Sequence, residues 1–166
     1  PGAFSSDAAI RIALPAAGHK NVGKLLELAQ QSGLSANLDA ALNRAAEQAA
    51  AQAKPIFRAA IDRATLNDAI DIARGGATGA TDYLRKSTGP QIAAQLQPLV
   101  RSALQGSGVL QKTAQLSALG FDEARLTDYV AGKTADGIFT YVGREETRLR
   151  QDPIGAGTQL LKGLKF

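Results

Sequence analysis

Apolar residues recur every three or four positions along most of this chain, which is the spacing of one face of an α-helix. The longest such run extends from Leu38 to Ala64 and contains Pro55. Because proline removes a main-chain donor and clashes with the preceding turn, the run predicts a helix that is kinked or broken near residues 51–54.

Shorter runs of the same period predict further helices, separated by glycine and proline. Gly75 and Gly76 end one of these helices, Gly89-Pro90 separates two others, and Pro98 is a second kink candidate. The predicted helices cover residues 21–31, 65–74, 79–88, 90–105, 110–118, 127–151 and a segment from Thr158 toward the C-terminus.

The first 18 residues are rich in Pro, Gly, Ser and Ala and predict an extended arm. Ile10, Ile12 and Leu14 alternate with other residues, as in a strand, but no second strand candidate is visible. We therefore expect this arm to pack these three side chains onto the helices. With no long linker and no internal repeat, the chain predicts one all-α domain over residues 1–166, a compact bundle with proline-kinked helices.

Composition supports helices and excludes several kinds of chemistry. About a fifth of the residues are alanine, the best helix former, and only 5% are aromatic. The chain has no cysteine and one histidine, His19, so we expect no metal, no cofactor and no Ser–His or Cys–His catalysis. No apolar run is long enough to span a membrane. The net charge of +4 is spread among residues of both signs, which makes nucleic acid an unexpected partner.

Several stretches together resemble domain-of-unknown-function family 4197, a bacterial group. The resemblance rests on AIRIALP (9–15), LNRAAEQAAAQAKPIFRAAI (42–61), TLNDAIDIARGGATGATDYLRKST (65–88) and DYVAGKTADGIFTYVGREETRLRQDP (128–153). It implies an all-helical protein that is commonly exported to the periplasm and has no established activity. Ala13 replaces a proline of the usual motif, and family members carry a further helix before the segment that begins here. Without that helix, we expect an apolar groove to be exposed.

The first candidate site is a polar patch on the predicted long helix. Asn43 and Glu47 lie one turn apart, Arg44 is beside them, and Lys54 follows two turns later. The two basic residues can bind a small anion or a carboxylate partner. Alternatively, the patch is an ion-pair network that ties this helix to a neighbour.

The second candidate follows the glycine-rich stretch GGATGAT and contains Tyr83 and Arg85, with Thr81 and Thr88 nearby. The N–H groups at a helix start can hold a phosphate. However, the stretch lacks the phosphate-loop pattern, and helix capping also explains its glycines.

The third candidate combines Asp136, Arg144 and Glu145 on the predicted 127–151 helix. Glu145 and Glu146 are adjacent, so they diverge by about 100° and do not converge on one ion. Gly137 permits close approach of another helix, and a buried Asp136 would need a partner. Our hypothesis pairs Asp136 with Arg44 or Arg85.

The sequence leaves three functions open. The first is a non-enzymatic binding or interaction module of the bacterial envelope, for a protein or for a small apolar or anionic ligand. The second is an enzyme of unrecognised type that uses Asp136, Glu145 and Arg44. The third is a binder of anionic lipid or polymer surfaces, which requires a continuous basic face.

Overall fold

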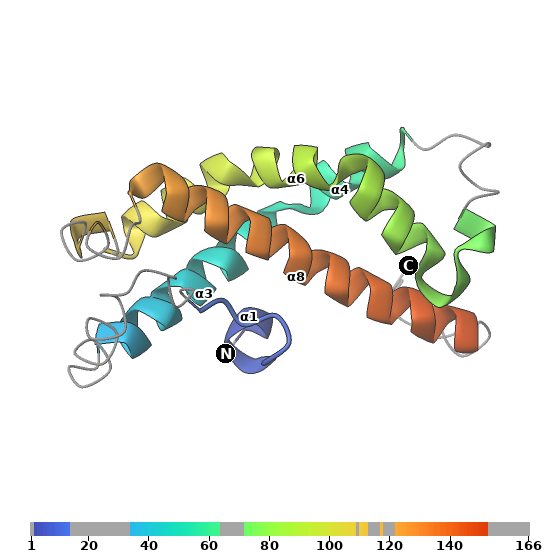
Figure 1. The fold of residues 1–166 in the computed structure, drawn as a ribbon, viewed down its shortest axis with the longest axis horizontal. Helices are drawn as coiled ribbons and strands as arrows, with labels where there is room; N and C mark the ends of the chain where they lie inside the picture. Colours follow the sequence, from blue (N-terminus) through green and yellow to red (C-terminus); the bar gives the residue numbers. More distant parts are fainter. Residues whose placement is uncertain are drawn as a thin grey trace, which may run out of the picture.

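Helix α8 (Glu123–Gln151) runs along most of the described part of the molecule, and both α3 and α6 pack against it (Figure 1). The computed structural model describes residues 2–13, 34–63, 72–108, 110–112, 117 and 122–152. The predicted helix 21–31, the helix starting at Thr158, Leu14 and most of segments 65–74 and 110–118 lie outside these residues.

The described elements are all helical and contain no strand, which confirms the all-α class. In chain order they are α1 (Ala3–Ser6), α3 (Leu34–Gln52), α4 (Lys54–Ile61), the short 3-10 turn η1 (Gly76–Thr78), α6 (Gly79–Gly106), the 3-10 turn η2 (Leu110–Lys112) and α8.

The core lies where α3 and α6 pack against α8. Alanines line the buried face of α3, and their small side chains let the helices approach closely. Branched side chains from α6 and α8 fill the space between them. The fully enclosed large side chains include Leu42, Ile92, Leu96, Val100, Leu104, Leu126, Val130 and Phe139.

The expected break near residues 51–54 is confirmed. Helix α3 ends at Gln52, the buried Ala53 lies between the two helices, and α4 begins at Lys54 with Pro55 in its first turn. Proline is tolerated at that position because the first N–H groups of a helix have no intrahelical partner.

The predicted division at Gly89-Pro90 is wrong, because α6 continues through both residues and through Pro98. Pro90 is exposed, so water can solvate the carbonyl that loses its helical donor. A Cβ at Gly89 would be 3.8 Å from the Phe139 ring of α8, an ordinary contact distance, so α6 packs on α8 at this point. Packing against α8 therefore keeps the helix intact, although its two halves run in different directions (Figure 1).

Helix α8 begins at Glu123, four residues before the predicted start. The side chain of Asp122 accepts a hydrogen bond from the main-chain N–H of Arg125 (2.8 Å), which caps this end. The other end, at Gln151, is as predicted.

The N-terminal arm packs onto the helices through Ile10 and Ile12, both buried, as expected. It is not extended throughout, because Ala3–Ser6 form the helical turn α1. Phe4 from this turn lies against Gly137 of α8, where even a methyl group would overlap the ring. Gly137 therefore permits a close approach, as predicted, and the neighbour is α1.

Candidate functional site

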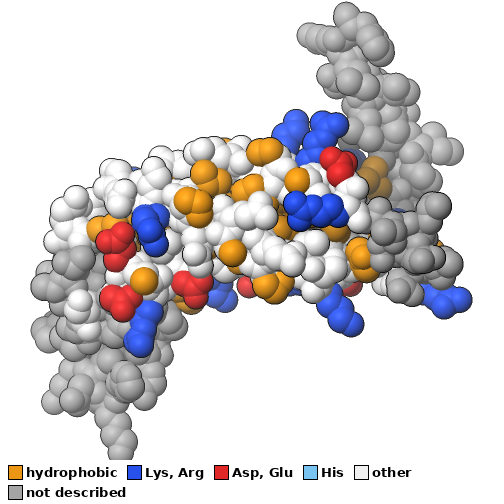
Figure 2. All heavy atoms as spheres, turned by 90° about the horizontal axis from the view of Figure 1, so that it is seen from above, with side chains coloured by type: hydrophobic (Ala, Val, Ile, Leu, Met, Phe, Trp, Pro, Cys, Tyr) orange, Lys and Arg blue, Asp and Glu red, His pale blue; other side chains and the backbone are white. Residues whose placement is uncertain are grey.

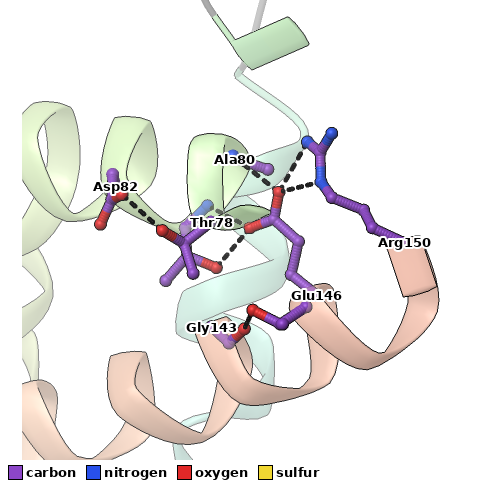
Figure 3. Close-up of polar contacts among 8 residues, drawn as sticks. Thr78, Ala80, Asp82, Gly143, Glu146 and Arg150 are labelled. Carbon is purple, nitrogen blue, oxygen red and sulfur yellow. Dashed lines mark hydrogen bonds and ion pairs between the residues drawn. The ribbon is translucent and has the colours of Figure 1, made fainter. Parts of the chain in front are cut away.

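Glu146 of α8 holds the first turn of α6 (Figure 3). One carboxylate oxygen accepts a hydrogen bond from the N–H of Ala80 (2.9 Å). The other accepts from the N–H and the hydroxyl of Thr81 (2.8 and 2.7 Å). Arg150 donates to the same carboxylate at 2.8 Å. Thr78, at the N-cap position, makes no capping bond and donates to Asp82. Glu146 thus accepts from N–H groups of the helix start that have no intrahelical partner, in place of a side-chain cap from Thr78.

The hydrogen bonds dominate the electrostatics of Glu146. Its side chain is 13% exposed, and burial alone would raise its pKa. The N–H of Ala80, the hydroxyl and N–H of Thr81 and the Arg150 guanidinium outweigh that effect and lower the pKa to about 2. Glu146 is therefore ionised at neutral pH.

Gly143 allows α6 and α8 to meet beside this carboxylate. A Cβ at position 143 would be 3.4 Å from the methyl group of Thr81 and 3.5 Å from that of Thr78. The two helices are in close contact there, and a hollow borders the contact on each side. Thr81 lines both hollows.

The first hollow, called the apolar groove here, has a volume of about 390 Å³. Its side chains are mainly aliphatic and come from the end of α4, from Ile72, from α6 and from α8. The lining residues are Ile61, Ile72, Ala80, Thr81, Leu84, Val142, Glu145, Glu146 and Leu149.

The apolar groove also gathers most of the exposed apolar bulk in the described part of the chain. In the described residues, four large hydrophobic side chains are exposed: Ile61, Tyr141, Val142 and Leu149. All but Tyr141 line the groove. Clustered exposed apolar groups of this kind mark ligand or partner sites more often than scattered ones do.

The second hollow, called the arginine hollow here, has a volume of about 270 Å³. Arg85 of α6 lies over the Phe139 ring at 5.3 Å, and Arg144 of α8 lies over Tyr141 at 5.2 Å. Arg144 also pairs with Asp7 of the arm, which lowers the pKa of Asp7. The hollow is lined by Thr78, Thr81, Asp82, Arg85, Phe139, Thr140, Gly143, Arg144 and Thr147.

Two residues of the first predicted patch hold the N-terminal arm. Asn43, buried in α3, accepts from the N–H of Ile12 (2.8 Å) and donates to its carbonyl (2.7 Å). Glu47 accepts from the N–H and hydroxyl of Ser5 (3.0 and 2.8 Å). Arg44 and Lys54 are exposed. These contacts tie α3 to a neighbouring segment, as the structural interpretation predicted, but through hydrogen bonds to the arm.

The proposed pairing of a buried Asp136 with an arginine is wrong. Asp136 is exposed, and Arg85 reaches only its main-chain carbonyl, at 3.5 Å. Arg44 is on the exposed side of α3. Position 136 faces outward because the adjacent Gly137 faces the arm.

Of the remaining predicted residues, Arg85, Arg144 and Glu145 each line one of the two hollows and Tyr83 lines neither. Glu145 lines the apolar groove and accepts from Arg148 (3.0 Å), which lowers the pKa of Glu145. Glu146 lines the same groove but pairs with a different arginine, Arg150. Tyr83 is half-buried and lines neither hollow.

The helix start that we considered for phosphate is occupied by the carboxylate of Glu146. Gly76 has a positive φ of 71°, as expected for a residue that ends a helix.

Sequence reasoning missed the main role of Glu146. Glu146 and Arg150 are four residues apart, a spacing that favours the observed ion pair on one helix. The contact to Ala80, in contrast, joins positions 66 residues apart. Because threonine is a common N-cap residue, the local sequence at Thr78-Gly79 did not indicate that this helix start takes its hydrogen-bond partner from α8.

Two observations on the described segments concern metal binding and membrane spanning. These segments contain no cluster of three or more potential metal ligands. Within the same residues, no helix has the length and apolar character needed to cross a bilayer.

The fold and the two hollows define an all-α domain with candidate binding surfaces. Residues 1–164 match the family described as "Protein of unknown function (DUF4197)", and the chain belongs to this family. Neither the curated proteins nor the solved structures contain a significant match to it.

Proposed function

We propose that this protein is a non-enzymatic binding module of the bacterial envelope, and that its apolar groove holds the aliphatic chain of a small amphiphilic ligand. One observation carries the proposal. Ile61, Val142 and Leu149 are exposed to water although they are large and apolar, and all three line one groove. Covering them with an apolar ligand is favourable by about 25 cal/mol for each Å² removed from water.

The dimensions of the groove favour a small molecule over a protein surface. Its volume of about 390 Å³ is within the usual range for small-molecule sites. A standard protein interface uses roughly 20–30 residues on each side, many more than line this groove. Among the described residues that line it, the groove offers branched aliphatic side chains and no aromatic ring for stacking, which suits an alkyl chain.

The charged residues at the groove support binding over catalysis. Glu145 pairs with Arg148 and Glu146 pairs with Arg150. Because the pKa of Glu146 is about 2, this carboxyl group carries no proton to donate near neutral pH. A general acid or base at this site would need a carboxyl group free to exchange its proton.

A continuous basic surface for anionic polymers or membranes has little support. On the face seen from above α6, Lys and Arg side chains lie among acidic and hydrophobic ones and do not form one strip (Figure 2).

Periplasmic placement is part of the proposal and is supported by the family resemblance alone. Cell fractionation of the native host with an antibody to this protein tests it.

The binding proposal is tested with a dansyl-labelled undecanoate, whose fluorescence rises in an apolar site. We expect saturable binding that unlabelled dodecanoate and dodecanol both displace. Displacement by the acid alone would show that the head group, and not the chain, dominates recognition. Absence of saturable binding by the probe would contradict the proposal.

Two substitutions on α8 provide a matched comparison. Leu149→Asn removes apolar surface from the groove at a position that is already 36% exposed, so the fold is expected to survive. We expect it to weaken probe binding roughly tenfold. Tyr141→Ser removes a side chain of similar exposure outside the groove, and its affinity is expected to match the wild type. Equal effects of both substitutions would contradict the assignment.

A further inference from the structure

The arginine hollow, on the other side of the α6–α8 contact, contains two guanidinium groups from different helices. Arg85 comes from α6 and Arg144 from α8, and both line the same space of about 270 Å³. Both lie over aromatic rings, Phe139 and Tyr141, which restricts how each planar group can turn.

The two arginines differ in how their charge is balanced. Arg144 has a carboxylate partner in Asp7. For Arg85, no carboxylate in the described residues is within ion-pair distance, and the guanidinium donates to the Asp136 carbonyl at 3.5 Å. That distance is at the outer limit of a hydrogen bond. Most donors of this guanidinium therefore remain available.

The threonines of the hollow limit which ligand groups fit there. Thr81 donates its hydroxyl proton to Glu146, Thr140 to the Asp136 carbonyl and Thr147 to the Gly143 carbonyl. Thr78 donates to Asp82. Because these protons are already used, the guanidinium groups are the donors that remain for an anion. The hydroxyl oxygens can still accept from a donor on the same ligand.

We propose that the arginine hollow is a binding site for a small oxyanion, held at Arg85 with support from Arg144. The planar guanidinium matches the two oxygens of a carboxylate or phosphate. This site is separate from the apolar groove, so the outcome of its test does not depend on the function proposed above.

The test is a titration of the ¹⁵N-labelled protein, observed at the arginine side-chain Nε–H signals, with inorganic phosphate and with acetate. Sodium chloride at equal ionic strength is the control for screening. We expect one of the two oxyanions to give a saturable shift at Arg85 and Arg144 that chloride does not reproduce. The anion that saturates identifies the preferred group.

Two substitutions separate a specific site from general charge. Arg85→Gln, at an exposed position, is expected to weaken the response at least tenfold, and Arg85→Lys is expected to weaken it less because the charge remains. Lys86→Gln removes an adjacent exposed charge outside the hollow and is expected to leave affinity unchanged. Non-saturable shifts with both anions, or equal losses in Arg85→Gln and Lys86→Gln, would overturn the proposal.

Discussion

The carboxylate of Glu146 accepts both the main-chain N–H and the hydroxyl of Thr81, at 2.8 and 2.7 Å, and so fixes the first turn of α6 to α8. This contact sets the position of the two hollows, because Thr81 lines both. The stability of the helix start and the geometry of the candidate sites are therefore linked.

Glu146→Gln is expected to lower the free energy of unfolding by roughly 2–3 kcal/mol at neutral pH. The substitution removes a charge that is hydrogen-bonded to two N–H groups and a hydroxyl. Urea unfolding followed by circular dichroism measures the change. Glu145→Gln is the matched control, because Glu145 is exposed and pairs only within its own helix, with Arg148. Similar losses in both variants would contradict the role assigned to Glu146.

Acid is expected to weaken the fold partly through Glu146. Its folded-state pKa of about 2 is below the ordinary value of 4.5, so the contribution is complete above pH 4.5. It is lost as the pH falls from 4.5 toward 2 and amounts to roughly 3 kcal/mol. The lowered pKa values of Asp7 and Glu145 act in the same direction. Unfolding free energies measured across this range should converge for the wild type and Glu146→Gln. A constant difference between them would contradict the linkage.

Gly137→Ala is expected to destabilise the protein and displace the arm, because the added methyl group would overlap the Phe4 ring. Gly132→Ala on the same helix is the control. A Cβ at position 132 meets nothing within 4 Å, so alanine should stabilise the helix by up to about 1 kcal/mol. Thermal unfolding of both variants measures the effects. A stabilising effect at position 137 would show that Phe4 does not pack as described.

Asn43→Ala is expected to release the arm from α3. The change leaves the buried N–H and carbonyl of Ile12 without their partner, at a cost of roughly 2–4 kcal/mol. Hydrogen exchange at the Ile12 amide should accelerate strongly. Arg44→Ala changes the exposed neighbouring residue and should leave this exchange rate as in the wild type. Unchanged exchange in Asn43→Ala would contradict the assigned contact.

The sequence predicted what depends on local pattern and missed what depends on distant contacts. Helical spacing and Pro55 correctly located the break between α3 and α4. The same rules wrongly ended a helix at Gly89-Pro90, because packing of α6 on α8 outweighs the local cost of proline.

In the candidate site, too, local pattern was predictable from the sequence and contacts between distant residues were not. The Glu146–Arg150 pair follows from a spacing of four residues on one helix. The contact of Glu146 with α6 depends on how two helices pack, and so does the outward direction of Asp136 beside the buried Gly137. Val142 and Leu149 are two turns apart on α8, so helical spacing places them on one face. Ile61 of α4 is distant in the sequence, and only the fold brings it to the same groove.

The most direct test of the proposed function is methyl NMR of the protein labelled at Ile, Leu and Val, titrated with dodecanoate. The proposal predicts saturable shifts at Ile61, Ile72, Leu84, Val142 and Leu149, which line the apolar groove. Core methyl groups of Leu96 and Leu104 should shift far less, because both are fully buried away from the groove. Shifts absent from the groove residues, or equally large in the core, would contradict the proposal.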